Sequence, residues 1–242
     1  MSQNILLSGV SKGLGLVIAE SLLRSGDTVY GIARSKTDAF DRLQEEFPER
    51  LFFKNVDLQD AKGAHKAVFD EFIDFDTPLH GFVNNAAMAY DDIITNLNLE
   101  PLEAMYRVNV FSPMILTKYV IRNMLLHRAA GSIVHISSIS VHTGYKGLSM
   151  YASTKGALEA FSKNTAREWG SRKIRSNCLV AGFMETEMSS SLSDDQKNRI
   201  YNRTSLKQAT EVKSVAETVA YLISEKSQSI TGQNIHVDSG TI

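Results

Sequence analysis

Short apolar runs alternate along the chain with longer stretches of helical period. Runs rich in β-branched residues predict strands at residues 4–8, 27–33, 50–55, 79–84, 131–137, 173–180 and 233–237. Apolar residues at helical spacing predict helices near residues 13–25, 38–47, 59–75, 99–127 (broken before Pro113), 151–170 and 211–224. This alternation is typical of a parallel sheet covered by helices. We therefore predict an α/β fold with a doubly wound sheet of about seven mostly parallel strands and helices on both faces.

Nothing in the pattern divides the chain. No Pro/Gly-rich linker, internal repeat or low-complexity tract occurs, so residues 1–242 are expected to form one domain. Gly26 is placed to end the first helix, where a residue with positive φ is common. The region 182–210 has no clear period and is either a plain surface loop or a lid over a site; we favour a substrate lid.

Composition narrows the class of protein. The chain is 43% hydrophobic, and its 26 basic and 27 acidic residues argue against nucleic acid or an anionic membrane as the main partner. The first residues lack a signal-peptide pattern and no apolar run is long enough to span a bilayer, so we expect a cytoplasmic protein. The single cysteine, Cys178, is expected to be a small buried hydrophobic residue. The six histidines show no metal-ligand spacing, so no metal site is expected.

A glycine-rich turn stands between the first predicted strand and the first predicted helix. Residues 8–15 read SGVSKGLG. Such a turn exposes backbone N–H groups and the positive end of a helix dipole, which together suit the diphosphate of a dinucleotide. Gly9 permits the tight turn, Gly13 lets the backbone approach the ligand, and Gly15 lets the helix pack on the strand. The position of the turn favours cofactor binding over a purely structural role.

The end of the second predicted strand indicates which dinucleotide binds. NAD sites usually carry an acid about 20 residues beyond the glycines, whereas an arginine accommodates the 2′-phosphate of NADP. Residues 31–35 read GIARS and contain no acid. Arg34 offers a planar fork and Lys12 a point charge, which favours NADP(H). The alternative is that both are solvated surface charges.

A second candidate site lies within residues 132–161. Tyr151 and Lys155 are four positions apart at the start of a predicted helix and therefore share one face. A phenol with a pKa of about 10 exchanges protons poorly near neutrality, but a neighbouring ammonium favours the phenolate. Ser138, at the end of a predicted strand, is placed to hydrogen-bond the same substrate oxygen. By itself, a Tyr–Lys pair on a helix is usually structural.

Together these motifs carry a family resemblance. They occur in the following order: Gly9-x-x-x-Gly13-x-Gly15, Asn84-Asn85-Ala86, Asn109, Ser138, Tyr151-x-x-x-Lys155 and Gly182-x-x-x-Thr186. Over essentially its whole length the chain resembles the short-chain dehydrogenase/reductases, which have a Rossmann-type fold. Within that family it is most similar to the 3-oxoacyl-(acyl-carrier-protein) reductases, through AGFMETEM at 181–188 and ITGQNIHVDSG at 230–240.

The resemblance implies a reaction and the roles of four residues. NADPH delivers a hydride to a carbonyl carbon while Tyr151 donates a proton to the oxygen. Ser138 holds and polarises that oxygen. Lys155 lowers the pKa of Tyr151 and binds the nicotinamide ribose, and Asn109 positions a water in the proton relay behind Lys155.

The resemblance also implies cofactor contacts. Asp57 would contact the adenine edge, Asn84 and Ala86 the adenosine side, and Met184 and Thr186 the nicotinamide side. The full implied set is Gly9, Ser11, Lys12, Gly13, Leu14, Gly15, Arg34, Asp57, Leu58, Asn84, Ala86, Tyr151, Lys155, Met184 and Thr186. Ala87 and Ala181 stand where the family usually has glycine and proline, so we expect altered loop geometry with the chemistry retained.

Substrate and partners are implied less directly. The similarity to 3-oxoacyl reductases implies a thioester on acyl carrier protein, docked by a basic patch that includes Arg128 and Arg172; the alternative is that these are solvated charges at helix ends. Rival hypotheses are a free ketone, sugar derivative or secondary alcohol as substrate, and a non-catalytic dinucleotide-binding regulatory protein. The resemblance further implies a homotetramer, built through the helices near 99–127 and 151–170 and through the C-terminal strand.

Overall fold

The structure, a computed structural model, describes residues 2–186 and 193–241. Its strands are β1 (Asn4–Ser8), β2 (Thr28–Ala33), β3 (Leu51–Asn55), β4 (Gly81–Asn84), β5 (Gly131–Ser138), β6 (Ile174–Ala181) and β7 (Asn234–Val237). They form one sheet in the order β3-β2-β1-β4-β5-β6-β7, and every neighbouring pair is parallel. The predicted doubly wound parallel sheet is thereby confirmed. The strand order reverses between β1 and β4, which is where ligands bind in such sheets.

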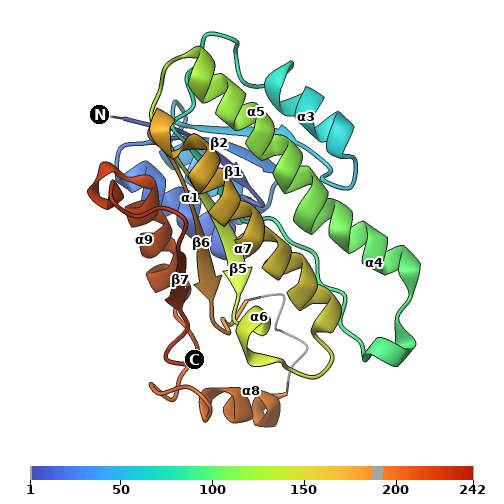
Figure 1. The fold of residues 1–242 in the computed structure, drawn as a ribbon. Coiled ribbons are helices and arrows are strands. Elements are labelled where there is room, and N and C mark those ends of the chain that lie inside the picture. Colours follow the sequence, from blue (N-terminus) through green and yellow to red (C-terminus); the bar gives the residue numbers. More distant parts are fainter. Residues whose placement is uncertain (1, 187–192, 242) are drawn as a thin grey trace.

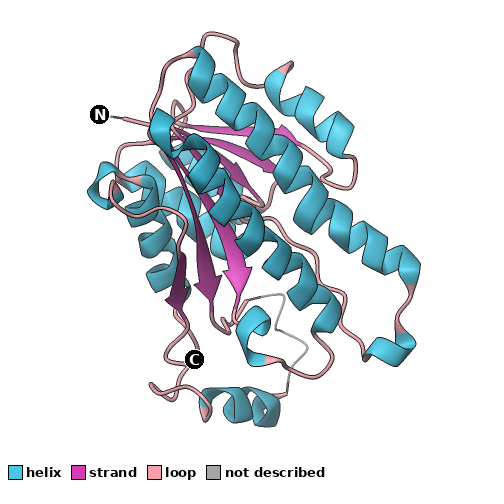
Figure 2. Cartoon of the chain, viewed as in Figure 1, coloured by secondary structure: helices cyan, strands magenta, loops and turns pink. Residues whose placement is uncertain are grey.

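Helices cover both faces of the sheet (Figures 1 and 2). They are α1 (Gly13–Arg24), α2 (Asp38–Glu46), α3 (Ala61–Phe69), α4 (Leu99–Tyr106), α5 (Ser112–Leu126), α6 (Ser140–Thr143), α7 (Ser149–Trp169), α8 (Asp194–Tyr201) and α9 (Val212–Ile223). Along β1, Ile5 and Leu7 pack into the apolar layer shared with α1 and α9, whereas Leu6 packs toward α3 and α5. The continuous apolar run of β1 therefore serves two cores, as a strand buried on both faces requires.

Two expectations about helices need correction. The predicted break before Pro113 is a π-helical segment, Arg107–Phe111, after which α5 begins with Pro113 in its first turn. Proline lacks a backbone N–H, but the N–H groups of a first helical turn have no partner within the helix. Pro113 therefore does not interrupt α5. The region 182–210 contains the helix α8. None of the side chains of α8 is buried, so its sequence shows no apolar period. A capping box of Ser193 and Gln196 begins it, and that local signal was present in the sequence.

One buried carboxylate joins four elements of the fold. Glu159, on α7, accepts hydrogen bonds from Ser137 Oγ of β5 at 2.5 Å and from Asn234 Nδ2 of β7 at 2.7 Å. His142 Nε2 of α6 lies 3.1 Å from the same carboxylate. Since Glu159 is 8% exposed, these partners replace the water that a carboxylate would otherwise bind. The contacts fix α7 against the carboxyl end of β5.

No helix of residues 2–186 and 193–241 has both the length and the apolar character needed to cross a bilayer.

Replacing Glu159 should therefore unfold the chain more easily. Glu159→Ala leaves the buried hydroxyl of Ser137 without its acceptor, removes the partner of Asn234, and should lower the free energy of unfolding by about 2–4 kcal/mol. Glu159→Gln keeps the shape and one acceptor oxygen and should cost about half as much. Urea denaturation measures both. Glu217→Ala is the control, because Glu217 pairs with Lys213 on the exposed surface at 3.8 Å and such pairs contribute little. Equal stability of Glu159→Ala and the control would contradict the assigned role.

Candidate active site

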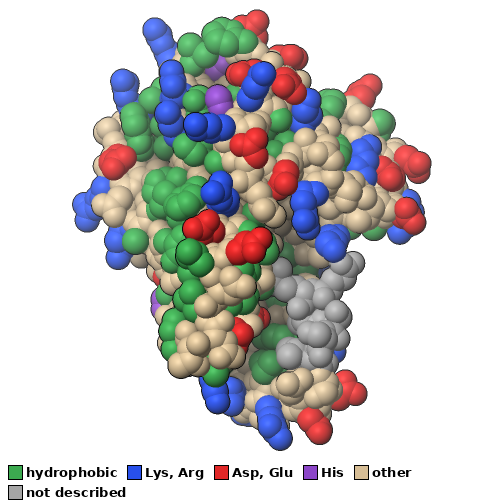
Figure 3. All heavy atoms as spheres, turned by 90° about the vertical axis from the view of Figure 1, so that its right-hand side faces the viewer, with side chains coloured by type: hydrophobic (Ala, Val, Ile, Leu, Met, Phe, Trp, Pro, Cys, Tyr) green, Lys and Arg blue, Asp and Glu red, His purple; other side chains and the backbone are tan. Residues whose placement is uncertain are grey.

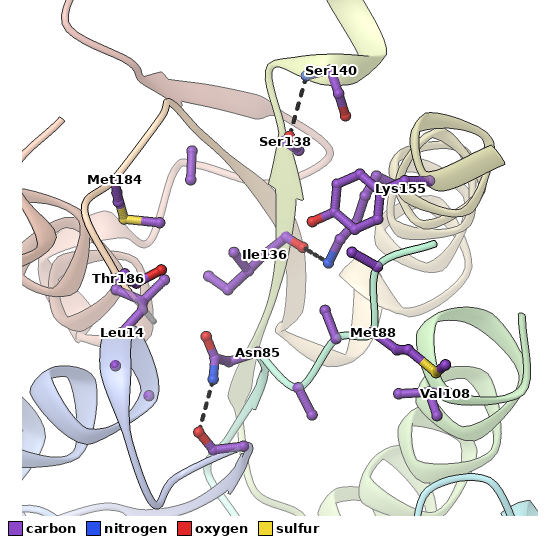
Figure 4. A pocket seen from close by; sticks show the side chains of 18 of the residues that line it. Leu14, Asn85, Met88, Val108, Ile136, Ser138, Ser140, Lys155, Met184 and Thr186 are labelled. Carbon is purple, nitrogen blue, oxygen red and sulfur yellow. Dashed lines mark hydrogen bonds between the residues drawn. The ribbon is translucent and has the colours of Figure 1, made fainter. Parts of the chain in front are cut away.

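A cleft of about 1110 Å³ opens at the carboxyl ends of the strands, beside the point where the strand order reverses. The glycine turn after β1, the end of β2 and the loop after β4 line one part of it. The end of β5, the start of α7, the loop after β6 and α8 line the rest. Segments far apart in the sequence therefore meet in one continuous site (Figure 4).

The glycine turn needs glycine for separate reasons at three positions. Gly9 has φ +70°, and a Cβ there would lie 2.9 Å from the Cα of Ala86. A Cβ on Gly15 would lie 1.9 Å from the carbonyl oxygen of Gly9, so α1 can approach β1 only with glycine at this place. Gly13 has φ +55° with nothing near its missing Cβ, so its constraint is conformational and its backbone borders the open cleft. The side chain of the N-cap residue, Lys12, makes no capping bond to α1, whose first N–H groups border the cleft and suit an anionic ligand.

The predicted cofactor residues line this part of the cleft, with one exception discussed below. Arg34 is exposed at the end of β2, and no carboxylate of the described residues pairs with it. Its backbone carbonyl is held by the side-chain amide of Asn55. Asp57 and Leu58 also line the cleft, with Asp57 Oδ1 accepting from the N–H of Gln59 at 2.9 Å. The remaining lining members are Gly9, Ser11, Lys12, Gly13, Leu14, Gly15, Ala86, Tyr151, Lys155, Met184 and Thr186.

The exception is Asn84, which was predicted to line the adenosine side. It is 2% exposed and lies behind the cleft, where its side chain is near Ser8 Oγ at 3.4 Å and His135 Nδ1 at 3.3 Å. The side chain of Asn85 faces the cleft instead and donates to the carbonyls of Ser8 and Gly9, at 3.1 Å each. Since Asn84 is the last residue of β4, the strand's alternation sends these two side chains to opposite places. Asn85 thus braces the glycine turn.

The candidate catalytic side chains lie where β5 ends and α7 begins. Ser138, Tyr151 and Lys155 all line the cleft, as predicted. Lys155 Nζ donates to the carbonyl of Ile136 at 2.9 Å and lies 5.6 Å from the centre of the Tyr151 ring (Figure 4). Ser138 Oγ accepts from the N–H of Ser140 at 3.2 Å, which leaves its own proton to donate. A carbonyl oxygen placed here can meet two hydroxyl donors.

Burial dominates the electrostatics of Tyr151 and Lys155. Burial raises the pKa of Tyr151 well above its ordinary value, and the carboxylate of Asp91 raises it further. Burial also lowers the pKa of Lys155, to about 8. The lowering of the Tyr151 pKa expected from Lys155 and an oxidised nicotinamide stays a prediction; in the chain alone, burial and Asp91 outweigh it, and the Lys155 ammonium bonds to the carbonyl of Ile136. The phenol accordingly holds its proton at neutral pH.

Asn109 fastens a loop rather than facing the cleft. It is 1% exposed, within the π-helical segment. Its Oδ1 accepts from the N–H of Met88 at 2.8 Å, and its Nδ2 donates to the carbonyl of Met88 at 2.8 Å and to Thr154 Oγ1 at 3.0 Å. These bonds tie the loop after β4 to α7. The positioning of a water by Asn109 stays a prediction.

Sequence reasoning missed much of the far end of the cleft. Tyr145, Lys146 and Leu148 line it from the segment between α6 and α7. Arg199 and Arg203 line it from α8 and the turn that follows. The only sequence signal for the second pair was the capping box that starts α8. Of the expected lid 182–210, residues 187–192 lie outside the described residues, and the closing of a lid stays a prediction.

The two predicted docking arginines lie away from the cleft of their own chain. Arg128 precedes β5, and Arg172 ends a short helix before β6. The N–H of Gly131 bonds to the carbonyl of Lys173 at 3.2 Å, so the two segments are neighbours at the amino ends of the strands. The cleft is at the carboxyl ends. Arg128 and Arg172 therefore form no patch beside the cleft of their own chain, because parallel strands separate their two ends by the height of the sheet.

Cys178 and His135 behave as structural residues. Burial raises the pKa of the Cys178 thiol to about 12, so the thiolate is absent at neutral pH. Burial and the nearby Lys155 lower the pKa of His135 to about 3, so the imidazole is neutral. Within residues 2–186 and 193–241, no three His, Cys, Asp or Glu side chains form a group that could hold a metal ion.

Comparison with known proteins places the chain in a family. A family model described as enoyl-(acyl carrier protein) reductase matches residues 9–241. The chain is 30% identical to a 3-oxoacyl-(acyl-carrier-protein) reductase of Chlamydia pneumoniae, with 99% of this chain and 97% of that protein covered. It is also 30% identical to an L-xylulose reductase of Caenorhabditis elegans, with 98% and 95% covered.

A solved structure shows the same fold. It comes from Agrobacterium tumefaciens, is assigned as a 2-deoxy-D-gluconate 3-dehydrogenase with bound NADP, and superposes with a TM-score of 0.91 over 99% of this chain and 96% of that one. At 21% identity this likeness supports the fold alone. The family match over nearly the whole chain and the relatives at 30% identity show that the chain belongs to the short-chain dehydrogenase/reductase family of oxidoreductases.

Proposed function

We propose that the chain is an NADP(H)-dependent ketoreductase whose substrate is a 3-oxoacyl thioester on acyl carrier protein. The observation that carries the proposal is that one cleft joins two sites. The glycine turn and Arg34 line one part, and Ser138 and Tyr151 line the next. A dinucleotide along the first part brings its reactive end to the second.

The residues around Tyr151 are arranged to reduce a ketone. Bound NADPH would supply the hydride for the carbonyl carbon. Tyr151, whose phenol carries its proton at neutral pH, gives that proton to the carbonyl oxygen as the new C–H bond forms. Ser138 donates a hydrogen bond to the same oxygen and so stabilises its growing negative charge. A secondary alcohol leaves, and the tyrosinate stays beside the Lys155 ammonium until it regains a proton.

Arg34 and Lys12 support NADP(H) over NAD(H). Both line the cleft at the turn and the end of β2, and no acid stands at the end of β2 to hold a ribose hydroxyl. The structural neighbour was solved with NADP bound.

The relatives leave two substrate classes open. The bacterial relative is named for 3-oxoacyl-carrier-protein reduction and supports the thioester. The nematode relative and the structural neighbour are named for sugar chemistry, which supports the alternative of a free ketone or sugar derivative. A non-catalytic regulatory protein is disfavoured, because such a protein would not need Ser138, Tyr151 and Lys155 at one place.

Docking of a carrier protein requires a second copy of the chain. Arg128 and Arg172 lie at the amino ends of the strands, whereas the cleft lies at the carboxyl ends, and α5 and α7 run between the two ends. If two copies pack antiparallel on these helices, the arginines of one copy come beside the cleft of the other. We therefore propose that the carrier protein docks on Arg128 and Arg172 of one copy and delivers its substrate to the cleft of the other copy.

We also propose that the chain forms a homotetramer, and exposed apolar side chains support this assembly. Ile94, Leu99 and Phe111 are 63%, 61% and 52% exposed around α4 and the start of α5. Figure 3 views the molecule from the side of α4 and shows hydrophobic side chains grouped on that surface. The strand β7 also forms an edge of the sheet, which a second copy could cover.

Removal of the Tyr151 hydroxyl tests the chemistry. Tyr151→Phe should lower kcat for acetoacetyl thioesters about 10²–10⁴-fold, since a positioned proton donor contributes about that much. The assay follows NADPH oxidation with the thioester on acyl carrier protein and on N-acetylcysteamine. Tyr221→Phe, an exposed position on α9, is the matched control. Binding of NADPH, followed by its fluorescence, should survive in Tyr151→Phe.

The same assay tests the substrate. A preference for the carrier-bound thioester that disappears in the Arg128→Glu, Arg172→Glu variant supports carrier docking. No turnover of either thioester, with sugar ketones reduced, would overturn the acyl substrate and keep the reductase. A wild-type rate matched by Tyr151→Phe would overturn the mechanism.

Charge reversal at Arg34 tests the cofactor. Arg34→Glu should raise the KM for NADPH about 10- to 100-fold and change the KM for NADH much less, because only NADPH carries the 2′-phosphate. Steady-state kinetics with both cofactors measure this. Lys36→Gln is the control, since Lys36 pairs with Asp41 at 3.4 Å and does not line the cleft. Equal losses for NADPH and NADH would contradict a phosphate contact.

The pH dependence of the reverse reaction tests the charge environment of Tyr151. Oxidation of an alcohol needs the phenolate, so kcat/KM should rise with pH as Tyr151 loses its proton. The negative charge of Asp91 raises the pKa of Tyr151, so Asp91→Asn should lower that pKa and move the rising limb to lower pH. Asp92→Asn is the control, because Asp92 Oδ1 bonds within its own turn, to the N–H of Ile93 at 2.7 Å. An unmoved limb in Asp91→Asn would refute the coupling.

A further inference from the structure

Three cations line the far end of the cleft, beyond Tyr151. Lys146 comes from the segment between α6 and α7, Arg199 from α8 and Arg203 from the turn after α8. All three are exposed to solvent in the cleft. Among the described residues, none of them makes an ion pair with a carboxylate.

The fold holds these cations in one place. Figure 1 shows α8 beyond the carboxyl ends of β5, β6 and β7. Residues of α8 line the cleft. Arg199 lies in the last turn of α8, and the N–H of Arg203 bonds back to the carbonyl of Ile200 at 3.0 Å, so the turn after α8 stays close to the helix and both arginines line the cleft. The guanidinium of Arg203 lies over the ring of Tyr145 at 5.6 Å from its centre, and this contact joins the end of α8 to the segment of Lys146.

Few negative charges oppose them. Asp91 lines the same cleft, on the side of the loop after β4 and near Tyr151. Asp57, the other carboxylate of the described lining, is at the cofactor part, after β3. Glu185 lies close to α8 but accepts a hydrogen bond from the Tyr201 hydroxyl and does not line the cleft. Asp194 and Asp195 begin α8 but do not line the cleft. Of the described residues that line this end, three are cations and one, Asp91, is a carboxylate, which favours a positive potential there.

We propose that Lys146, Arg199 and Arg203 form an anion subsite, so that the substrate is a ketone with a phosphate or carboxylate group away from its carbonyl. This inference rests on the proposed ketoreductase function and specifies its substrate. Two guanidinium forks and an ammonium suit either anion. The phosphate of a phosphopantetheine arm and the carboxylate of a free keto acid are the two sources of such a charge.

The cofactor does not account for these cations. Its diphosphate fits the start of α1, and its 2′-phosphate fits Arg34 and Lys12, which belong to other elements. The three cations come from α8, the turn after it and the segment between α6 and α7, which carry none of the predicted cofactor residues. A positive group there acts on the part of the substrate that extends out of the cleft.

Two matched substrate pairs test the subsite. Acetoacetyl-4′-phosphopantetheine and acetoacetyl-pantetheine differ only in the phosphate, and 5-oxohexanoate and its methyl ester differ only in the carboxylate. With saturating NADPH, the wild type should prefer the charged member of at least one pair by about tenfold in kcat/KM. In Arg199→Gln, Arg203→Gln this preference should fall toward one, and added salt should reduce it in the wild type.

Controls separate the subsite from other causes. Lys197→Gln, on α8 but outside the cleft lining, should keep the wild-type preference. Equal use of charged and neutral members by the wild type overturns the inference. So does a rise in the KM for NADPH equal to the loss for the charged substrate, because the cations would then serve the cofactor. Thermal melting checks that the double variant folds.

Failure of the proposed function is a separate outcome. If none of the four compounds is reduced, the ketoreductase proposal fails, and calorimetry still decides the subsite. Binding of 4′-phosphopantetheine or 5-oxohexanoate should then weaken about tenfold in the double variant, while binding of neither anion by the wild type overturns the subsite.

Discussion

The hydrogen bond from Lys155 to the carbonyl of Ile136 is the contact on which the reactive part of the cleft depends. It is 2.9 Å long and buried, and it joins α7 to β5 two residues before Ser138. A buried ammonium is costly without a partner, so Lys155 can stay charged only if β5 and α7 keep this spacing. That spacing in turn places Ser138 and Tyr151 on the same side of the cleft. Glu159, one turn further along α7, secures the same pair of elements from behind.

Much of this arrangement could be predicted because it follows from local rules. Each strand is an apolar run that parallel packing requires, and the glycines at 9, 13 and 15 answer to a close contact or a positive φ that other residues resist. The helical spacing of Tyr151 and Lys155 similarly holds without tertiary information. These features are properties of short segments, and the sequence records them directly.

The parts that escaped prediction depend on what lies around a residue. Asn84 and Asn85 are chemically the same, and only the position where β4 ends decides that one is buried and the other faces the cleft. The pKa of Tyr151 is set by desolvation and by Asp91, and neither is visible in the spacing to Lys155. Arg128 and Arg172 have the right charge for docking, yet the topology puts them at the amino ends of the strands, away from the cleft. None of the side chains of α8 is buried, so its sequence has no apolar period from which a helix could be predicted.

The charges around Tyr151 also bear on how a substrate would enter. Asp91 lies on the side of the loop after β4, and Lys146, Arg199 and Arg203 line the cleft toward α8. An anionic group is repelled from the first side and attracted to the second, so the field across the cleft is asymmetric. A ketone with a remote anion is then oriented before its carbonyl reaches Ser138. A neutral sugar would gain nothing from this field, and its orientation would have to come from hydrogen bonds alone. The electrostatics of the cleft thus bear on the choice between the two substrate classes that the relatives leave open.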